Sequence, residues 1–240
     1  KTDWKQIKEL FFVVWHNAWR DGAISIANYL CNQASTVICS MYLSLAEVGI
    51  YSIGVQIALA IAQISGTLYT AYQPELQSAY INSNIDKMKR SMSVIVMTFS
   101  YLFIMGTVGV IVVGLPILRL IKPSTVVSVP ILIGLCIYQF MLKFRNCYTS
   151  YFSCTNRIIY VNGFIFSALL CVILSVVMIG PLHFGIWGLI VSQIISQAIY
   201  NVWKWPVKAH KEMQLSIVEL IKIGTSDAWG SISRVIMKKK

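Results

Sequence analysis

Long apolar stretches, separated by short polar segments, cover most of the chain. About 20 consecutive apolar residues cross a bilayer as a helix, and the pattern predicts six such helices. Their approximate ranges are 12–41, 50–73, 93–118, 126–152, 161–179 and 185–205. The last two share the stretch 158–203, which has no Asp, Glu, Lys or Arg and is divided by the turn signal GPLHFG at 180–185. We therefore predict an all-α, polytopic membrane protein in which residues 1–206 form a six-helix transmembrane unit.

The polar segments mark the limits of this unit. We expect Pro74 to end the second helix and the cationic segment 77–92 to form a short surface helix. Residues 207–240 form a basic tail, which we expect to be cytoplasmic. Within it, Ser216 to Glu219 (SIVE) has the form of a helix capping box before Leu220. This pattern predicts a short interfacial helix in the tail.

The composition agrees with a membrane location. Hydrophobic residues make up 57% of the chain, charged residues 12%, and the mean hydropathy is +0.68, whereas soluble domains contain about 25% charged residues. The sequence does not begin with Met, and we expect it to be part of a longer polypeptide.

The net charge of +11 would suggest nucleic-acid binding in a soluble protein, but the basic residues follow the predicted loops. Only Arg119 and Lys122 fall in a predicted outer loop. Most others lie at the start, in the second-to-third and fourth-to-fifth loops, and in the tail. By the positive-inside rule, both termini are predicted to be cytoplasmic, and nucleic acid is not an expected partner.

Three predicted helices carry polar residues at spacings of three, four or seven, which place them on one helical face. The stripes are Asn17, Asp21, Asn28, Asn32, Ser35 and Cys39 on the first helix, Gln56, Gln63, Thr67 and Thr70 on the second, and Gln139, Lys143, Asn146 and Ser150 on the fourth. Such stripes either line a hydrophilic cavity or hold helices together by hydrogen bonds. Three stripes in one small bundle favour a cavity.

Three cations, Arg20, Lys143 and Arg145, fall within predicted helices. Charges inside a lipid-spanning helix are costly and usually functional. Alternatively, the first helix spans 22–46 and the fourth spans 123–142, which leaves these cations and Asp21 at the membrane interface. The turn at 46–49 and the continued helical pattern after Arg145 favour buried positions.

Catalytic patterns are scarce. The chain has no H-E-x-x-H, G-x-S-x-G or P-loop motif, and Asp21 is the only acidic residue near a predicted membrane core. The six cysteines show no metal-ligand spacing, and His16 is interpreted as a structural or interfacial residue. We therefore predict no enzyme activity, no metal and no cofactor.

Several stretches of the chain, taken together, resemble segments of the proteins of one known superfamily. They are EVGIYSIGVQIA at 47–58, YQPELQSAYINSNIDKMKR at 72–90, GLPILRLI at 114–121 and YFSCTNRIIYVNGFIF at 151–166. The turn HFGIWGLIVSQIISQ at 183–197 resembles a Tyr-Gly…Gly-small-small turn, with Phe184 before the glycine here. The chain resembles the C-terminal half of a polysaccharide (O-unit, Wzx-type) flippase of the MOP superfamily, which also contains the MATE multidrug exporters.

The resemblance implies one lobe of a two-lobe transporter with a central cavity. It implies that a lipid-diphosphate-linked oligosaccharide crosses the bacterial inner membrane by alternating access during surface polysaccharide synthesis. Arg20, Lys143 and Arg145 would then bind the anionic headgroup, and Asn28, Asn32, Gln56 and Gln63 would meet sugar hydroxyls. Implied partners are membrane lipids, the N-terminal lobe and a polysaccharide polymerase.

Three other functions stay open at this point. A cation-coupled, MATE-like drug exporter would favour buried carboxylates, and this half offers only Asp21. A membrane-embedded glycan-synthesis enzyme would need acidic clusters or large outer loops. A scaffold without transport activity would not need the polar stripes.

Overall fold

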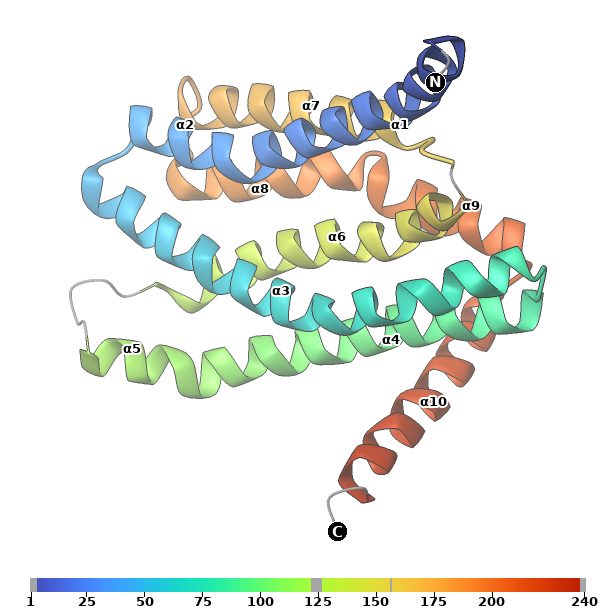
Figure 1. Cartoon of the computed structure of the whole chain (residues 1–240). Helices are drawn as coiled ribbons and strands as arrows, with labels where there is room; N and C mark the ends of the chain where they lie inside the picture. Colours follow the sequence, from blue (N-terminus) through green and yellow to red (C-terminus); the bar gives the residue numbers. More distant parts are fainter. Residues whose placement is uncertain (1–3, 122–126, 156, 238–240) are drawn as a thin grey trace.

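The computed structural model describes residues 4–121, 127–155 and 157–237 (Figure 1). These residues are helical apart from short turns, and no strand occurs among them. The elements are α1 (Trp4–Tyr29), a π-helical turn (Leu30–Ala34), α2 (Ser35–Tyr42), α3 (Leu45–Ile81), α4 (Ile85–Gly109), a second π-helical turn (Val110–Gly114), α5 (Leu115–Ile121), α6 (Val129–Cys154), α7 (Val161–Ile179), α8 (Gly185–Ala198), α9 (Asn201–Met213) and α10 (Ile217–Met237).

Three helices are long and apolar enough to cross a membrane. They are Leu45–Thr67 within α3, Ile85–Ile121, which joins α4 to α5, and Val161–Ile179, which is α7. Apolar side chains cover much of their outer surface, as lipid requires. Ile104, Val112 and Ile173, for example, are all exposed. The protein is therefore an all-helical membrane protein.

The turn between the fifth and sixth predicted helices is confirmed. The helix predicted at 161–179 is α7, and the next helix begins at Gly185. Within the turn, His183 and Gly185 have φ values of 53° and 57°. This left-handed conformation suits glycine, which explains the glycine that begins α8.

The second helix does not end at Pro74, as the sequence predicted. It continues to Ile81, and the turn follows at Asn82–Asn84, where Ser83 has a φ of 51°. The reason is packing: Leu76 and Ala79 beyond the proline are buried, and so are Met88 and Met92 in the first turns of α4. Burial of these side chains outweighs the single hydrogen bond that proline removes. The cationic segment is therefore part of a helical hairpin and not a separate surface helix.

Other boundaries also differ from the predicted ones. The first helix begins at Trp4 and contains a π-helical turn, and the sixth is divided into α8 and α9 at Ile199–Tyr200. The tail forms α10 over 21 residues, longer than the short helix predicted. The predicted start of the fourth helix at 126 and the cation Lys122 lie outside the described residues.

The helices form two groups joined by α6. In one group α1 packs on α7, and α7 packs on α8; in the other, α3 packs on α4, and α4 on α10. α6 contacts both groups through α3, α4, α8 and α9. Figure 1 shows that α1 and α3 are close at the end where α2 connects them and diverge towards the other end, with α6 visible between them.

α10 crosses α4 at a glycine. A Cβ atom on Gly224 would lie 2.4 Å from Met97 Cγ and 2.6 Å from the Ser93 carbonyl oxygen. On α10, Glu219 precedes Gly224 and Asp227 follows it. Glu219 forms a salt bridge with Lys89 at 3.4 Å, and Asp227 forms one with Arg90 at 2.5 Å. The close approach of the two helices therefore requires a residue without a side chain at position 224.

We expect Gly224→Leu to destabilise the protein by about 1–3 kcal/mol, because the new side chain must displace the backbone of α4. Thermal unfolding of the detergent-solubilised protein measures the effect. Gly66→Leu is the matched control, since nothing lies within 4 Å of a Cβ at that helical glycine. Equal losses for both variants would contradict the close packing at Gly224.

Candidate functional site

Arg145 is the central residue of a polar cluster inside the bundle. Its side chain is 1% exposed. Nη1 donates to Gln197 Oε1 at 2.5 Å, Nη2 donates to Asn28 Oδ1 at 2.7 Å, and Nε donates to Asn146 Oδ1 at 3.4 Å. The guanidinium also lies over the Phe164 ring, 3.7 Å from its centroid. Arg145 thus connects α6 to α1, α7 and α8.

The charge of Arg145 is not neutralised locally. Every ion pair in the described part of the chain involves other residues. A buried charge is normally paired because its desolvation is costly. Here amide oxygens and an aromatic face support the cation, and its positive potential therefore extends into the surrounding bundle.

The polar cluster continues along α8 and α9. Gln197 Oε1 also accepts from Asn201 Nδ2 at 3.4 Å, and the same Nδ2 donates to Ser167 Oγ at 2.7 Å. Asn201 Oδ1 accepts from Trp205 Nε1 at 2.9 Å. Gln193, one turn before Gln197, donates to Tyr51 of α3 at 3.0 Å. The hydrogen bonds around Arg145 therefore join α1, α6, α7, α8 and α9, and the separate bond from Gln193 to Tyr51 links α8 to α3.

The sequence reasoning missed the residues of α8 and α9. Gln193, Gln197 and Asn201 lie in the charge-free stretch that was interpreted only as apolar. Their spacing of four and four is the same one-face pattern that identified the other stripes. That signal was available in the sequence.

The π-helical turn of the first helix contributes a backbone acceptor. A π-helical turn shifts the hydrogen-bond register of a helix, and here the Cys31 carbonyl oxygen accepts from Tyr138 Oη of α6 at 2.9 Å. Next to it, Gln139 Nε2 donates to Asn32 Oδ1 at 3.2 Å. The turn therefore fixes the first helix against α6 beside Arg145.

The structure brings together the predicted stripes of the first and fourth helices. Asn28 and Asn32 meet Arg145 and Gln139, and Asn146 bonds Arg145. The Asn146–Arg145 bond lies within α6, whereas α6 bonds across the helix interface to Asn32 in the π-helical turn and to Asn28 on α1. Asp21 on the same helix is exposed. The side chain of Asn17 lies outside the described residues.

The three predicted cations do not form one cluster. Lys143 and Arg145 are two residues apart on a helix and so point about 200° apart. Lys143 is half-buried. Arg20 is also half-buried and lies near the Trp19 ring, 5.9 Å from its centroid. Only Arg145 belongs to the buried cluster.

The predicted stripe of the second helix lies on the surface of the described bundle. Gln56, Gln63, Thr67 and Thr70 of α3 are all exposed. The two threonines donate to backbone carbonyls of their own helix. Neither glutamine amide makes a hydrogen bond within the described part of the chain. Exposed amides within a membrane-spanning helix need water, another protein surface or a polar ligand.

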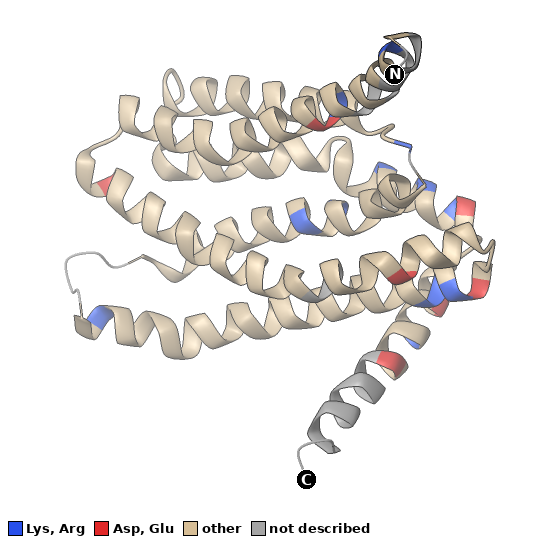
Figure 2. Cartoon of the chain, viewed as in Figure 1, with Lys and Arg blue, Asp and Glu red and all other residues tan. Residues whose placement is uncertain are grey.

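Basic residues gather at one end of the bundle. Figure 2 shows Lys and Arg concentrated where α4 and α10 begin, whereas a single cation lies on α5 at the opposite end. Arg157, between α6 and α7, bonds Glu212 of α9 at 2.6 Å, and this hydrogen bond raises the pKa of the Arg157 guanidinium. The ends of α1 and α3 that diverge are at this basic end (Figure 1).

No match was found when the chain was compared with protein families, with curated proteins and with solved structures. The described residues contain no group of His, Cys, Asp and Glu that could hold a metal ion. A functional interpretation therefore depends on the buried cation, the polar face of α3 and the distribution of charge.

Proposed function

We propose that this chain is one six-helix lobe of a two-lobe transporter of the MOP superfamily, a Wzx-type polysaccharide flippase. Its substrate is a lipid-diphosphate-linked oligosaccharide, which it moves across the bacterial inner membrane by alternating access. The basic end of the bundle is cytoplasmic, in agreement with the positive-inside rule. Alternating access requires that this end of the lobe open and close towards the cytoplasm.

The observation that carries the proposal is the buried guanidinium of Arg145 without a carboxylate. A cation in a low-dielectric environment attracts a diphosphate far more strongly than one in water. Lys143 on the same helix is half-buried and adds a second positive charge. The exposed amides of Gln56 and Gln63 on α3 supply hydrogen-bond partners for sugar hydroxyls.

A MATE-like exporter of cationic drugs is the second candidate. Such a protein needs buried carboxylates to attract its substrate, and Asp21 is exposed while Glu47 caps the start of α3 through Ser44 at 2.6 Å. The positions of Asp21 and Glu47 therefore favour an anionic substrate over a cationic drug.

The test is transport by the complete protein, with both lobes, in proteoliposomes. Two fluorescent substrates are compared: a lipid-diphosphate-linked oligosaccharide and a lipophilic cationic dye. We expect accelerated movement of the lipid-linked glycan and none of the dye. Dye transport without glycan movement would replace the proposal by the exporter, and no movement of either would reject both.

A further inference from the structure

Gln197 of α8 accepts the shortest of the three hydrogen bonds described above for Arg145, from Nη1 to Oε1 at 2.5 Å. Its side chain is fully buried, with 0% of its surface exposed. A buried guanidinium is normally paired with a carboxylate, because the desolvation of an unpaired charge is costly. Here the neutral isostere of a glutamate occupies the position where a carboxylate would form that ion pair.

A chain of hydrogen bonds fixes which end of the Gln197 amide faces Arg145. The indole Nε1 of Trp205 can only donate, so its 2.9 Å bond identifies Asn201 Oδ1 as an acceptor. The other end of the Asn201 amide, Nδ2, then donates to Gln197 Oε1 at 3.4 Å and to Ser167 Oγ at 2.7 Å. Gln197 Oε1 therefore meets two donors, one from Asn201 and one from Arg145. The amide oxygen, and not the amide N–H, is held against the guanidinium.

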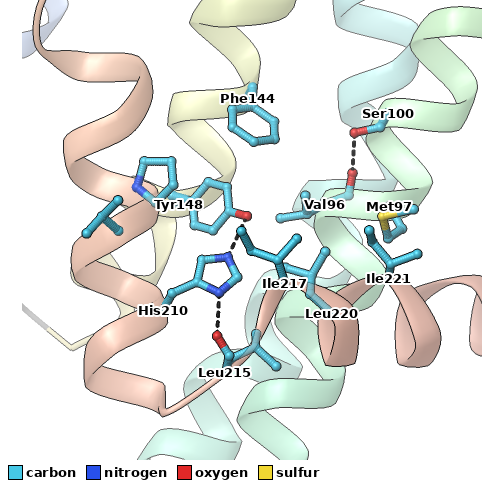
Figure 3. Close-up of a pocket in the computed structure, with 12 residues that line it drawn as sticks. Val96, Met97, Ser100, Phe144, Tyr148, His210, Leu215, Ile217, Leu220 and Ile221 are labelled. Carbon is cyan, nitrogen blue, oxygen red and sulfur yellow. Dashed lines mark hydrogen bonds between the residues drawn. The ribbon is translucent and has the colours of Figure 1, made fainter.

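His210 of α9 bonds α6 at Tyr148, one turn beyond Arg145, and is a second candidate for a charge inside the bundle. It lines an apolar groove of about 440 Å³ between α4, α6, α9 and α10 (Figure 3). Its Nδ1 lies 2.6 Å from the Leu215 carbonyl oxygen, which can only accept, and its Nε2 lies 3.0 Å from Tyr148 Oη. A neutral imidazole with its proton on Nδ1 satisfies both bonds. His210 therefore needs no charge of its own, and Arg145 is the cation whose charge Gln197 controls.

We infer that Gln197 is a positioning residue that sets the charge specificity of the Arg145 site. Its amide oxygen holds the guanidinium in place but leaves the positive charge available to an anionic ligand. Gln197→Glu would hold the guanidinium as well and would also neutralise it, because a carboxyl group beside an arginine stays ionised. This inference rests on the proposed function, since the anionic ligand is the diphosphate of the lipid-linked glycan.

Two substitutions separate the charge from helix packing. Gln197→Glu keeps the side-chain length and the acceptor for Arg145 and Asn201, whereas Gln197→Met removes the acceptor and leaves the cation unpaired. If Gln197 only joined helices, Gln197→Met would be the more damaging change for both stability and ligand binding. If Gln197 sets the charge, the two properties change in opposite directions: Gln197→Glu is the more stable variant and the weaker binder of an anion.

The test is equilibrium binding to the purified, complete protein with both lobes in detergent, together with thermal unfolding. Two fluorescent glycolipids with the same glycan are titrated, one with the lipid diphosphate and one with an uncharged linker. We expect Gln197→Glu to bind the diphosphate form about tenfold or more weakly than the wild type does, with unchanged affinity for the uncharged form. Gln197→Met should bind the diphosphate form within about threefold of the wild type, at a lower unfolding temperature than Gln197→Glu.

Gln193→Glu is the matched control for stability. Gln193 is also buried on α8, one turn before Gln197, but its amide donates to Tyr51 at 3.0 Å and not to Arg145. The new carboxylate has no cation as its partner there, so Gln193→Glu should unfold at a clearly lower temperature than Gln197→Glu.

Equal affinity of the wild type and Gln197→Glu for the diphosphate form would overturn this inference and leave the proposed function standing. A Gln197→Glu protein that does not fold, or that unfolds at the temperature of Gln193→Glu, would overturn it as well, because no ion pair with Arg145 has then formed. A wild-type protein that binds the two glycolipids equally would overturn the inference together with the proposed function.

Discussion

Replacing Arg145 by Met is expected to lower the rate of glycan transport about tenfold or more while the protein stays folded. Hydrogen bonds to a charged group are worth about 1.5–3 kcal/mol, and 1.4 kcal/mol corresponds to a factor of ten. Met fills a similar volume but removes the positive potential. It also leaves Asn28 Oδ1 without its 2.7 Å donor, so stability should fall by about 1–3 kcal/mol. Transport in proteoliposomes and thermal unfolding measure the two effects separately.

Arg145→Lys distinguishes charge from helix packing. Lysine keeps the positive charge, but it lacks the planar guanidinium whose separate N–H groups donate to Gln197 and Asn28. If the charge attracts the substrate, the Lys variant should transport faster than the Met variant although both are destabilised. If the residue only holds helices together, the two variants should lose stability equally and transport at the normal rate once folded.

Gln56→Leu combined with Gln63→Leu is expected to reduce transport about tenfold without loss of stability. The two amides are exposed and make no hydrogen bond within the described part of the chain, so folding does not depend on them. Each lost hydrogen bond to a sugar hydroxyl costs about 0.5–1.5 kcal/mol. Transport assays and unfolding curves of the double variant check both parts of the prediction.

Asn162→Leu is the matched control for this double variant. It makes the same kind of amide-to-leucine change at an exposed position on α7, outside the polar face of α3, and should transport normally. If the glutamines face lipid, the double variant should instead be more stable and equally active, because leucine is far less costly than an amide in hydrocarbon.

The helical class and several boundaries could be predicted because apolar periodicity and turn residues are local signals. α7 has the predicted range, and the GPLHFG turn has left-handed residues as such turns require. Pro74 misled the prediction, since burial of Leu76 and Ala79 is a tertiary effect that local propensity does not contain. The π-helical turn that contains Cys31 accepts a hydrogen bond from Tyr138, a contact between residues far apart in sequence that local patterns do not contain.

The candidate site could be predicted only in part. The one-face spacing identified Asn28, Asn32 and Gln139, which do meet across the interface between the first helix and α6. Spacing along one helix does not say what lies opposite, and so it could not separate buried Arg145 from half-buried Lys143. For the same reason it could not show that the stripe on α3 is exposed while Asn28, Asn32, Gln139 and Asn146 are bonded internally.

If this chain is a transporter, the polar face of α3 should line an aqueous path and should not face lipid. Cysteine accessibility in the membrane tests this most directly. The six native cysteines, which are all free, are first replaced in a variant that retains transport. Single cysteines are then placed at Gln56, Gln63 and Thr70 on the polar face, and at Ile104 and Ile173 on exposed apolar faces of α4 and α7.

The measurement is the rate of reaction with a hydrophilic, charged thiol reagent applied from the cytoplasmic side of membrane vesicles. We predict rapid reaction at positions 56, 63 and 70 and none at 104 and 173, with protection of the reactive positions by the lipid-linked glycan. Equal protection from the reagent at all five positions would mean that the α3 stripe faces lipid or a dry interface, and it would contradict the account.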